Sequence, residues 1–265
     1  MDNQHLFLRY KRAADRAAIG DRHLSAEGRA EMRALIDAAR EKLRVHESVC
    51  VVLPCGGGKT ACASKMLHTV AARGRRGIFA CHRVEILQQT MDTFDAFGIP
   101  YGVVASGYAP NPFQPIQIAS IDTLRSRIKR GKFTWKPDLV ITDECHHSVS
   151  QSWAYVRAHF SGAKHIGLTA SPIRLDSRGL GEQYQSMVVG PSVADLIEMG
   201  WLSKYRYFEP PSADLSTVHT NKHDYVKADA EGVMDKPSIT GDAVAHYLKL
   251  LRDKRAIVFC LSIAH

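Results

Sequence analysis

The sequence predicts an α/β protein with a parallel sheet covered by helices on both faces. From about residue 48 onward, short and nearly continuous apolar runs alternate with helical stretches, the pattern of repeated β-α units whose strands are buried on both faces. The chain has 265 residues, which is enough to bury a sizeable core. The predicted strands are Val49–Leu53, Gly77–Cys81, Tyr101–Ala105, Ile116–Ile121, Leu139–Thr142 and His165–Thr169, and the clearest helices between them are Thr60–Ala72, Val84–Phe97 and Asp122–Lys129.

Composition limits the classes of protein to consider. Thirty-five Lys and Arg against 27 Asp and Glu give a formal net charge of +8, which favours polyanionic partners without naming one. No apolar run is long enough to span a bilayer and no segment reads as a signal peptide, so we expect a cytoplasmic location and no membrane partner. The six cysteines contain no C-x-x-C pair, which favours buried free thiols over disulfides or zinc ligands.

Two helices are predicted before the first strand. His5–Ile19 carries apolar residues at helical spacing and is ended by Gly20. A second helix is predicted from about Glu27 to Val45, with Met32, Leu35, Ile36, Ala39 and Leu43 on one face. We expect both helices to pack on the core that follows and to take no part in chemistry.

The segment after the first strand has the composition of a phosphate-binding loop. Gly56, Gly57 and Gly58 follow the strand, and Lys59 and Thr60 open a helix. Glycines let several backbone N–H groups converge on an anion at a helix N-terminus. Lys59 would then reach the β- and γ-phosphates, and the Thr60 hydroxyl would bind Mg²⁺. The strict pattern begins with a further glycine, where this chain has Leu53, so a simple glycine-rich turn is the alternative.

A second candidate element follows the strand Leu139–Thr142, which ends in the adjacent carboxylates Asp143 and Glu144. The C-terminal ends of parallel strands lie at one edge of a sheet, so this pair should face the phosphate loop. One carboxylate can hold Mg²⁺ and the next can polarise the water that attacks the γ-phosphate. A solvated strand end is the simpler interpretation of the pair.

The rest of the chain suggests a boundary between domains. A capping-box spacing predicts a short helix that opens at Pro191–Asp195 and closes at Gly200. Another amphipathic stretch, Asp242–Leu251, precedes an apolar strand at Ala256–Leu261, which cannot form a sheet alone. We therefore predict a helical segment over 1–46, the main α/β domain over 47–208, a linker or insertion over 209–240 and the start of a second domain over 241–265.

Together these motifs resemble those of superfamily 2 helicases and translocases of the DEAD/DEAH-box type, in the form found in phages and prophages. Pro54–Thr60 resembles motif I, Asp143–His146 motif II and Gly167–Pro172 motif III. Weaker matches lie at Ala80–Leu87 for motif Ia, Ala119–Leu124 for motif Ib and Ile257–His265 for motif IV.

The resemblance implies a RecA-like P-loop NTPase fold, with ATP and Mg²⁺ as cofactors and DNA, single-stranded or duplex, as the partner; RNA is the alternative. It implies that Gly56, Gly57, Gly58, Lys59 and Thr60 bind the nucleotide. It also implies that Asp143 and Thr60 bind Mg²⁺ and that Glu144 is the general base. Nucleotide state would be coupled to strand binding by His146, Thr169 and Ser171. The nucleic-acid backbone would be contacted by Arg83, Ser120 and Thr123.

Simpler interpretations stay open for several of these residues. His146 and His147 could be metal ligands, although the sequence shows no further His/Cys cluster at ligand spacing. Arg83 could be a surface residue at a helix start. Ser120 and Thr123 could form an ordinary helix cap.

Parts of the family pattern are missing. There is no convincing glutamine motif for adenine near the N-terminus, and motifs V and VI would lie beyond His265. Motif VI carries an arginine finger, which is worth roughly 10³–10⁵ in rate. We therefore expect weak ATP hydrolysis from a chain in which the second RecA-like domain is truncated.

Three functions compete at this point. The first is an ATP-dependent DNA helicase or translocase. The second is the ATPase motor part of a restriction or repair complex whose nuclease lies elsewhere. The third is a non-catalytic nucleic-acid-binding remnant, against which the retention of Lys59, Thr60, Asp143 and Glu144 argues.

Overall fold

The computed structural model divides the chain into two compact units, Met1–Lys204 and Tyr205–His265. The predicted boundaries after residues 46, 208 and 240 stay predictions. The predicted helix at His5–Ile19 lies outside the residues that the structure describes. These are 26–147, 151–173, 179–207, 215–221, 224–226, 229–230, 233 and 237–258.

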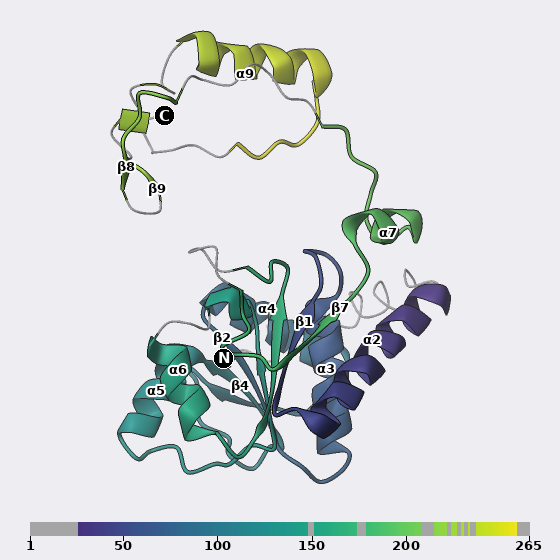
Figure 1. Cartoon of the computed structure of the whole chain (residues 1–265), viewed down its shortest axis with the longest axis vertical. Helices are drawn as coiled ribbons and strands as arrows, with labels where there is room; N and C mark the ends of the chain where they lie inside the picture. The colour runs from purple at the N-terminus through teal and green to yellow at the C-terminus, as the bar shows by residue number, and fades with distance from the viewer. Residues whose placement is uncertain are drawn as a thin grey trace, which may run out of the picture. The chain divides into compact units, whose positions relative to one another are not determined.

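The first unit contains a seven-stranded sheet in which every neighbouring pair of strands is parallel, as the sequence predicts. The strand order is β3-β4-β2-β5-β6-β1-β7. Figure 1 shows this sheet between two layers of helices. Since β6 lies between β1 and β5, the ends of these two strands are close together at one edge of the sheet. The strands are β1 (Ser48–Val52), β2 (Gly77–Cys81), β3 (Gly102–Val104), β4 (Ile116–Ser120), β5 (Leu139–Thr142), β6 (Lys164–Thr169) and β7 (Ser186–Val189).

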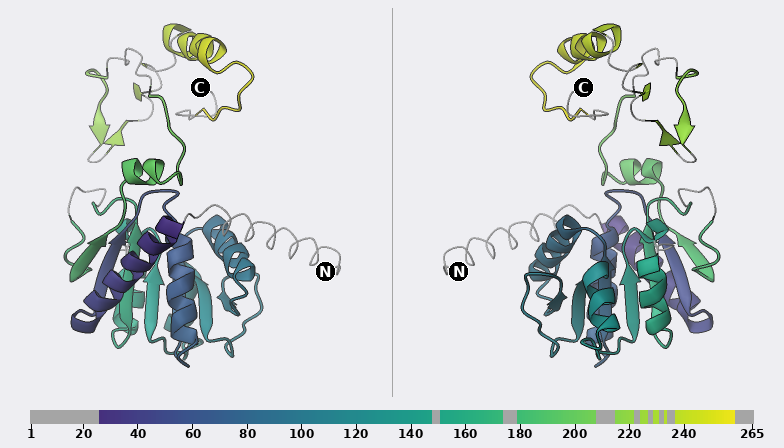
Figure 2. Two further views of the ribbon diagram at one scale, coloured as in Figure 1. Left: turned by 90° about the vertical axis from the view of Figure 1, so that its right-hand side faces the viewer. Right: turned by 90° about the vertical axis from the view of Figure 1, so that its left-hand side faces the viewer.

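Helices cover both faces of this sheet, as predicted (Figure 2). Alternating side chains of strand β2 belong to the hydrophobic cores on opposite faces of the sheet. Phe79 packs with residues of α2, α3 and α4, whereas Ile78 and Ala80 pack with residues of α5 and α6. Side chains of a strand point alternately to its two faces, so a continuous apolar run is what a doubly covered strand requires. The helices are α2 (Ala26–Val45), α3 (Lys59–Ala71), α4 (Val84–Ala96), α5 (Ile121–Lys129) and α6 (Gln151–His159).

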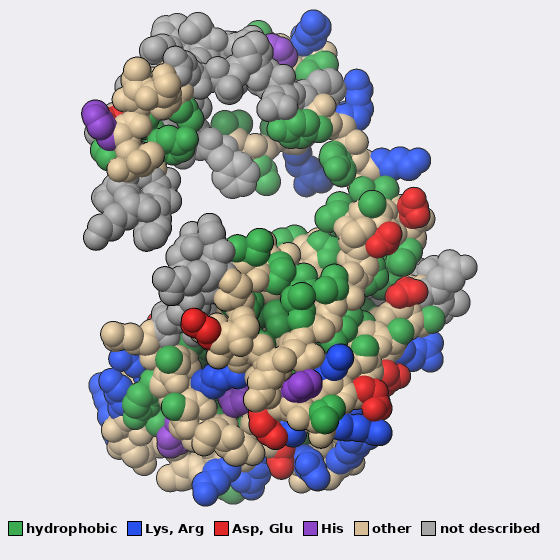
Figure 3. All heavy atoms as spheres, in the orientation of Figure 1, with side chains coloured by type: hydrophobic (Ala, Val, Ile, Leu, Met, Phe, Trp, Pro, Cys, Tyr) green, Lys and Arg blue, Asp and Glu red, His purple; other side chains and the backbone are tan. Residues whose placement is uncertain are grey.

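Strand β7 and helix α6 are not predicted by the sequence pattern. The edge strand β7 alternates between half-buried and exposed residues, and Met187 and Val189 are exposed. Figure 3 shows hydrophobic side chains gathered on the surface near β7 and α7 (Val193–Glu198). Helix α6 has only Trp153 and Val156 buried. A strand or helix that buries so little apolar surface gives a weak periodic signal.

Helix α7 confirms the predicted capping box, because the Ser192 side chain accepts from the Asp195 N–H while the Asp195 carboxylate accepts from the Ser192 N–H. At its C-terminus Gly200 has φ +73°, and the Trp201 N–H donates to the Leu196 carbonyl at 2.8 Å. This left-handed turn reverses the chain immediately after the helix. It directs Trp201 and Leu202 back toward the core of the first unit.

The described part of the second unit contains little regular structure. Strands β8 (Thr220–Asn221) and β9 (Asp224–Tyr225) form a short antiparallel pair, and helix α9 (Pro237–Leu250) covers most of the predicted amphipathic stretch. The predicted strand at Ala256–Leu261 is not seen in its described part, since residues 255–258 have no regular structure and Ile257 is exposed. Its remaining residues, like most of the motif IV match, lie outside the described part of the chain. Among the described residues, no helix is both long and apolar enough to cross a membrane.

Candidate functional site

The loop between β1 and α3 has a backbone that only glycine adopts easily. Gly56 has φ +78° and Gly58 has φ +83°, both in the left-handed region. The Gly57 N–H donates to the Pro54 carbonyl at 3.0 Å, and a Cβ on Gly57 would approach that carbonyl oxygen to 3.0 Å. The loop therefore curls over the start of α3, where free helix N–H groups favour an anion.

Apolar side chains from α2, from α7 and from the segment just after α7 pack against the three glycines. A Cβ on Gly56 would lie 2.7 Å from Leu202, and one on Gly58 would lie 3.1 Å from Met32. On Gly57, the corresponding distance to Leu196 would be 3.3 Å. The loop therefore has a packed apolar surface on one side, which sequence reasoning missed because these contacts join distant parts of the chain.

The two acidic residues after β5 occupy different environments. Asp143 extends the sheet, since its N–H donates to the Ala80 carbonyl at 2.9 Å, and it is only 6% exposed. Its Oδ1 atom is buried without a hydrogen-bond partner among the described residues. Burial, and then the charge of Glu144, raise the pKa of Asp143 to about 6. Glu144 has φ +47°, which costs on the order of 1–3 kcal/mol for a non-glycine residue.

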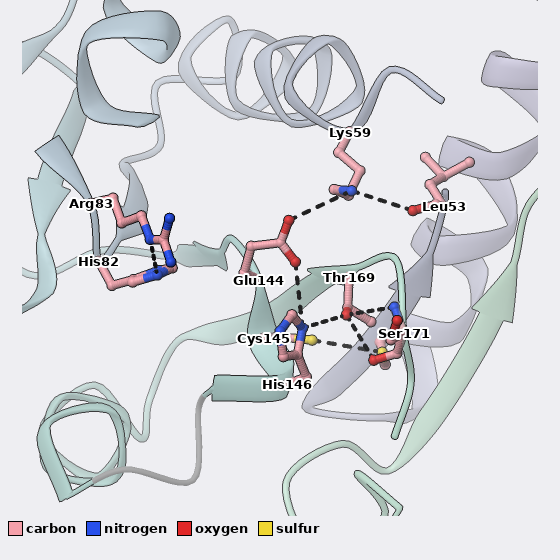
Figure 4. A network of polar contacts seen from close by, with 10 residues as sticks. Leu53, Lys59, His82, Arg83, Glu144, Cys145, His146, Thr169 and Ser171 are labelled. Carbon is pink, nitrogen blue, oxygen red and sulfur yellow. Dashed lines mark hydrogen bonds and ion pairs between the residues drawn. The ribbon is translucent and has the colours of Figure 1, made fainter. Parts of the chain in front are cut away.

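The phosphate loop and the acidic strand end meet (Figure 4). The Lys59 Nζ atom lies 3.7 Å from Glu144 Oε1 and 3.5 Å from the Leu53 carbonyl oxygen. The lysine and glutamate side chains are only 12% and 24% exposed, so water screens this ion pair less than a surface pair. Lys59 and the acidic pair therefore lie at the same edge of the sheet.

A polar chain continues from Glu144 to the end of β6 (Figure 4). The His146 Nδ1 atom lies 3.4 Å from Glu144 Oε2 and 2.9 Å from Thr169 Oγ1. Thr169 donates its single hydroxyl hydrogen to the Ser171 carbonyl at 2.9 Å, so it must accept from His146 Nδ1–H. The structure thus brings together the three residues predicted to couple nucleotide state to strand binding, and it fixes one tautomer of His146.

The donor set fits a magnesium ion. Asp143 offers a buried carboxylate oxygen that has no hydrogen-bond partner among the described residues, and Thr60 lies half-buried in the first turn of α3. Magnesium is typically held by one or two protein oxygens together with substrate phosphates. No group of three or more His, Cys, Asp or Glu residues suited to a metal occurs in the described part of the chain, so His146 and His147 gain no third partner.

The three predicted nucleic-acid residues lie at the ends of β2 and β4, and within the described part of the chain no hydrogen bond or ion pair joins them to the Lys59–Glu144 pair. Arg83 is exposed at the N-cap of α4, and its Nε donates to His82 Nε2 at 3.2 Å. Ser120 occupies the N-cap of α5, but its side chain makes no capping hydrogen bond. Thr123 follows in the first turn of α5. The roles of all three residues stay predictions.

The cysteines are largely as predicted. Among the described residues, four free thiols are buried, and Cys55 is the exception because it lies exposed in the phosphate loop. Cys50 and Cys145 approach to 3.8 Å behind the acidic strand end. A Cβ on Gly167 would meet Cys145 Sγ at 2.7 Å, so this glycine leaves the space that the thiol occupies. Cys260 lies outside the described residues.

A comparison with protein families matches residues 25–174 to the family described as "Type III restriction enzyme, res subunit". This range is more than half of the chain and contains all the residues to which the sequence assigns a role. It also contains the loop, the acidic strand end and the polar chain described above.

Two curated proteins are also similar to this chain. A 51.5 kDa protein of a Lactococcus phage (isolate 7-9) is 27% identical over 210 residues, which cover 79% of this chain and 43% of that protein. IRC3 of Saccharomyces cerevisiae, described as a candidate ATP-dependent helicase, is 26% identical over 237 residues, 83% of this chain and 34% of that protein. The chain thus spans less than half the length of these curated relatives.

One solved structure supports the fold. A nuclease-deletion mutant of the Type ISP restriction-modification enzyme LlaGI, in complex with a DNA substrate mimic, superposes with a TM-score of 0.52 at 15% identity. The match covers 64% of this chain and 20% of that enzyme. At this identity the likeness concerns the fold alone, and it agrees with a RecA-like sheet.

Proposed function

Because the chain belongs to the family described as "Type III restriction enzyme, res subunit", a family of superfamily 2 helicase relatives, we propose that it is the first motor domain of an ATP-dependent DNA translocase. It binds ATP in the loop before α3 and hydrolyses it at the tip of β5. The single observation that supports this most is the 3.7 Å ion pair between Lys59 and Glu144, which joins the glycine loop to the acidic strand end.

The geometry of the site supports a role for each of these residues. The loop N–H groups and the Lys59 ammonium bind the β- and γ-phosphates, and Glu144 orients the attacking water and accepts its proton. Thr60 and Asp143 hold the magnesium ion. The chemistry supplied by bound magnesium is neutralisation of the charge on the β- and γ-phosphates.

The polar chain through His146 gives this site a route to the nucleic acid. When ATP binds, Glu144 exchanges its lysine partner for the attacking water, and its contact with His146 changes with it. His146 in turn bonds Thr169 at the end of β6. We expect this chain to transmit the nucleotide state toward the edge of the sheet where Arg83, Ser120 and Thr123 are proposed to contact the DNA backbone, with RNA as the alternative partner.

Two substitutions separate binding from hydrolysis. Lys59→Ala should weaken binding of Mg²⁺·ATP by at least about tenfold, because a charged hydrogen bond to phosphate is lost. Glu144→Gln should keep ATP binding but lower single-turnover hydrolysis by roughly 10²–10⁴, the contribution typical of a general base. ATP affinity is measured by calorimetry and hydrolysis by phosphate release, with and without DNA.

Glu41→Gln is the matched control, since Glu41 is exposed on α2 and, among the described residues, its ion pair is with Arg44. Equal ATP binding by the wild type and Lys59→Ala would refute the nucleotide site. Unchanged hydrolysis in Glu144→Gln would refute the role of that residue as the base.

A second function is favoured by the family description, which names a restriction enzyme subunit. In this case the same ATPase forms the motor part of a restriction complex, and the nuclease lies in another domain or chain. The two functions predict the same ATP hydrolysis. They differ in whether purified protein, together with the products of the neighbouring genes, cleaves DNA when ATP is supplied.

A further inference from the structure

A cavity of about 520 Å³ extends from the phosphate loop along helix α4. On the loop side it is lined by Gly56, Lys59, Thr60 and Ala61 among others, and on the other side by one face of α4. The triphosphate would occupy only the loop end of this cavity. The remainder of the cavity, along α4, could then hold the base and ribose of the same nucleotide.

Helix α4 has two distinct faces. Leu87, Thr90, Met91 and Phe94 are buried against the sheet. The cavity is lined instead by residues spaced three, four, seven and eight positions apart, which share one helical face. These residues are Gln89, Asp92, Thr93, Ala96 and Phe97.

The chemistry of this face suits a nucleoside. Phe97, at the C-cap of α4, is 51% exposed as a residue, so its ring offers an aromatic surface on which a base can stack. Asp92 accepts from Gln88 Nε2 at 2.9 Å, which fixes a carboxylate on the cavity side of the helix. A carboxylate is a group that accepts hydrogen bonds from ribose hydroxyls in dinucleotide-binding proteins.

Gln89 gives a reason to prefer adenine. Its side chain is exposed, and its amide makes no hydrogen bond within the described part of the chain. A glutamine amide can accept from adenine N6–H and donate to N7 at the same time. Guanine presents two acceptors, O6 and N7, at the corresponding positions, so one of the two bonds would be replaced by a repulsive contact.

We infer that helix α4 forms the nucleoside half of the nucleotide site, with Phe97 stacking on the base and Gln89 selecting adenine over guanine. This inference rests on the proposed function, because it takes the phosphate loop as the site of the triphosphate. It assigns to α4 the recognition of the base, for which the sequence offers no glutamine motif near the N-terminus.

The test compares three ligands in the presence of Mg²⁺: ATP, GTP and inorganic tripolyphosphate, which lacks a nucleoside. Their dissociation constants are measured by calorimetry for the whole chain. The wild type should bind ATP about tenfold more tightly than GTP. Phe97→Ala should lose about tenfold in ATP affinity and keep its tripolyphosphate affinity. Gln89→Leu should reduce the preference for ATP over GTP to less than about threefold.

Matched controls are available outside the cavity. Phe113→Ala removes a phenylalanine that is 94% exposed, and Gln151→Leu changes an exposed glutamine at the start of α6, on the opposite face of the sheet. Both controls should bind all three ligands like the wild type.

Each contrary result has a definite meaning. If Phe97→Ala and Gln89→Leu bind ATP and GTP like the wild type while tripolyphosphate still binds, the nucleoside site is not on α4. If either variant loses tripolyphosphate as well as ATP, its side chain acts through the phosphate loop, and the assignment is wrong. If the wild type binds no tripolyphosphate, or Lys59→Ala binds it equally well, the proposed function itself fails.

Discussion

At the residue scale, burial in the sheet affects two titratable side chains in opposite ways. It raises the pKa of Asp143 to about 6 and lowers the pKa of His165 to about 4, because in each case it disfavours the charged form. Asp143 lies at the candidate site, where an oxygen without a protein partner can serve a ligand. His165 lies in β6, where its Nε2 is 3.1 Å from the Phe160 carbonyl and donates to it when the ring is neutral.

His165 should make stability fall in acid. The pKa of histidine in an unfolded chain is about 6.5. Between about pH 6.5 and pH 4, His165 therefore binds a proton in the unfolded chain but stays neutral in the folded chain. The contribution of neutral His165 is therefore complete above about pH 6.5 and is lost as the pH falls toward 4, by up to about 3 kcal/mol.

This expectation is checked by urea unfolding of the wild type and His165→Gln between pH 4.5 and 7.5. The glutamine amide can still donate to the Phe160 carbonyl but does not titrate in this range. The variant should lose less stability than the wild type on acidification. Parallel stability curves for the two proteins would show that His165 does not carry the effect.

At the element scale, close packing between neighbouring strands and the segments behind them sets the shape of the site. Cys50 of β1 is paired in register with Gly167 of β6. Gly167 leaves room for Tyr184 and Cys145, the residue that follows Glu144. The position of the acidic strand end therefore depends on a glycine that lies in a different strand.

Gly167→Ala should destabilise the first unit. Its Cβ would lie 2.4 Å from Tyr184 Cζ and 2.7 Å from Cys145 Sγ, so buried side chains must shift, at a cost of about 1–3 kcal/mol. The matched control is Gly162→Ala, because a Cβ there meets nothing within 4 Å. Thermal unfolding should show a lower Tm for Gly167→Ala and a nearly unchanged one for Gly162→Ala. Equal Tm values would contradict this account of the packing.

Elements were predictable where the local sequence carries the signal. The strand before the phosphate loop, the glycines at positive φ and the acidic pair after β5 are each defined by consecutive residues. Helix α6 and strand β7 were missed because they bury few apolar side chains. The packing of Leu202 on Gly56, and the cavity between the loop and α4, depend on contacts across the fold and leave no pattern in the sequence.

At the scale of the whole molecule, the strand order brings the two predicted motifs together. Strands β1 and β5 are far apart in the chain but are separated in the sheet only by β6, whose own end supplies Thr169. All three strands run parallel, so their C-terminal ends lie at one edge. The candidate site is therefore a consequence of topology, and every residue proposed to act on ATP belongs to the first unit.

The most direct test of the account measures how much magnesium strengthens ATP binding in the wild type and in Asp143→Asn. The substitution preserves the shape of the side chain and removes its charge, while Lys59 stays in place. Magnesium should tighten ATP binding at least about tenfold in the wild type and less than about threefold in the variant, because the metal loses its buried carboxylate. A full magnesium effect in Asp143→Asn would contradict the claim that the glycine loop and the acidic strand end share a magnesium-bound triphosphate.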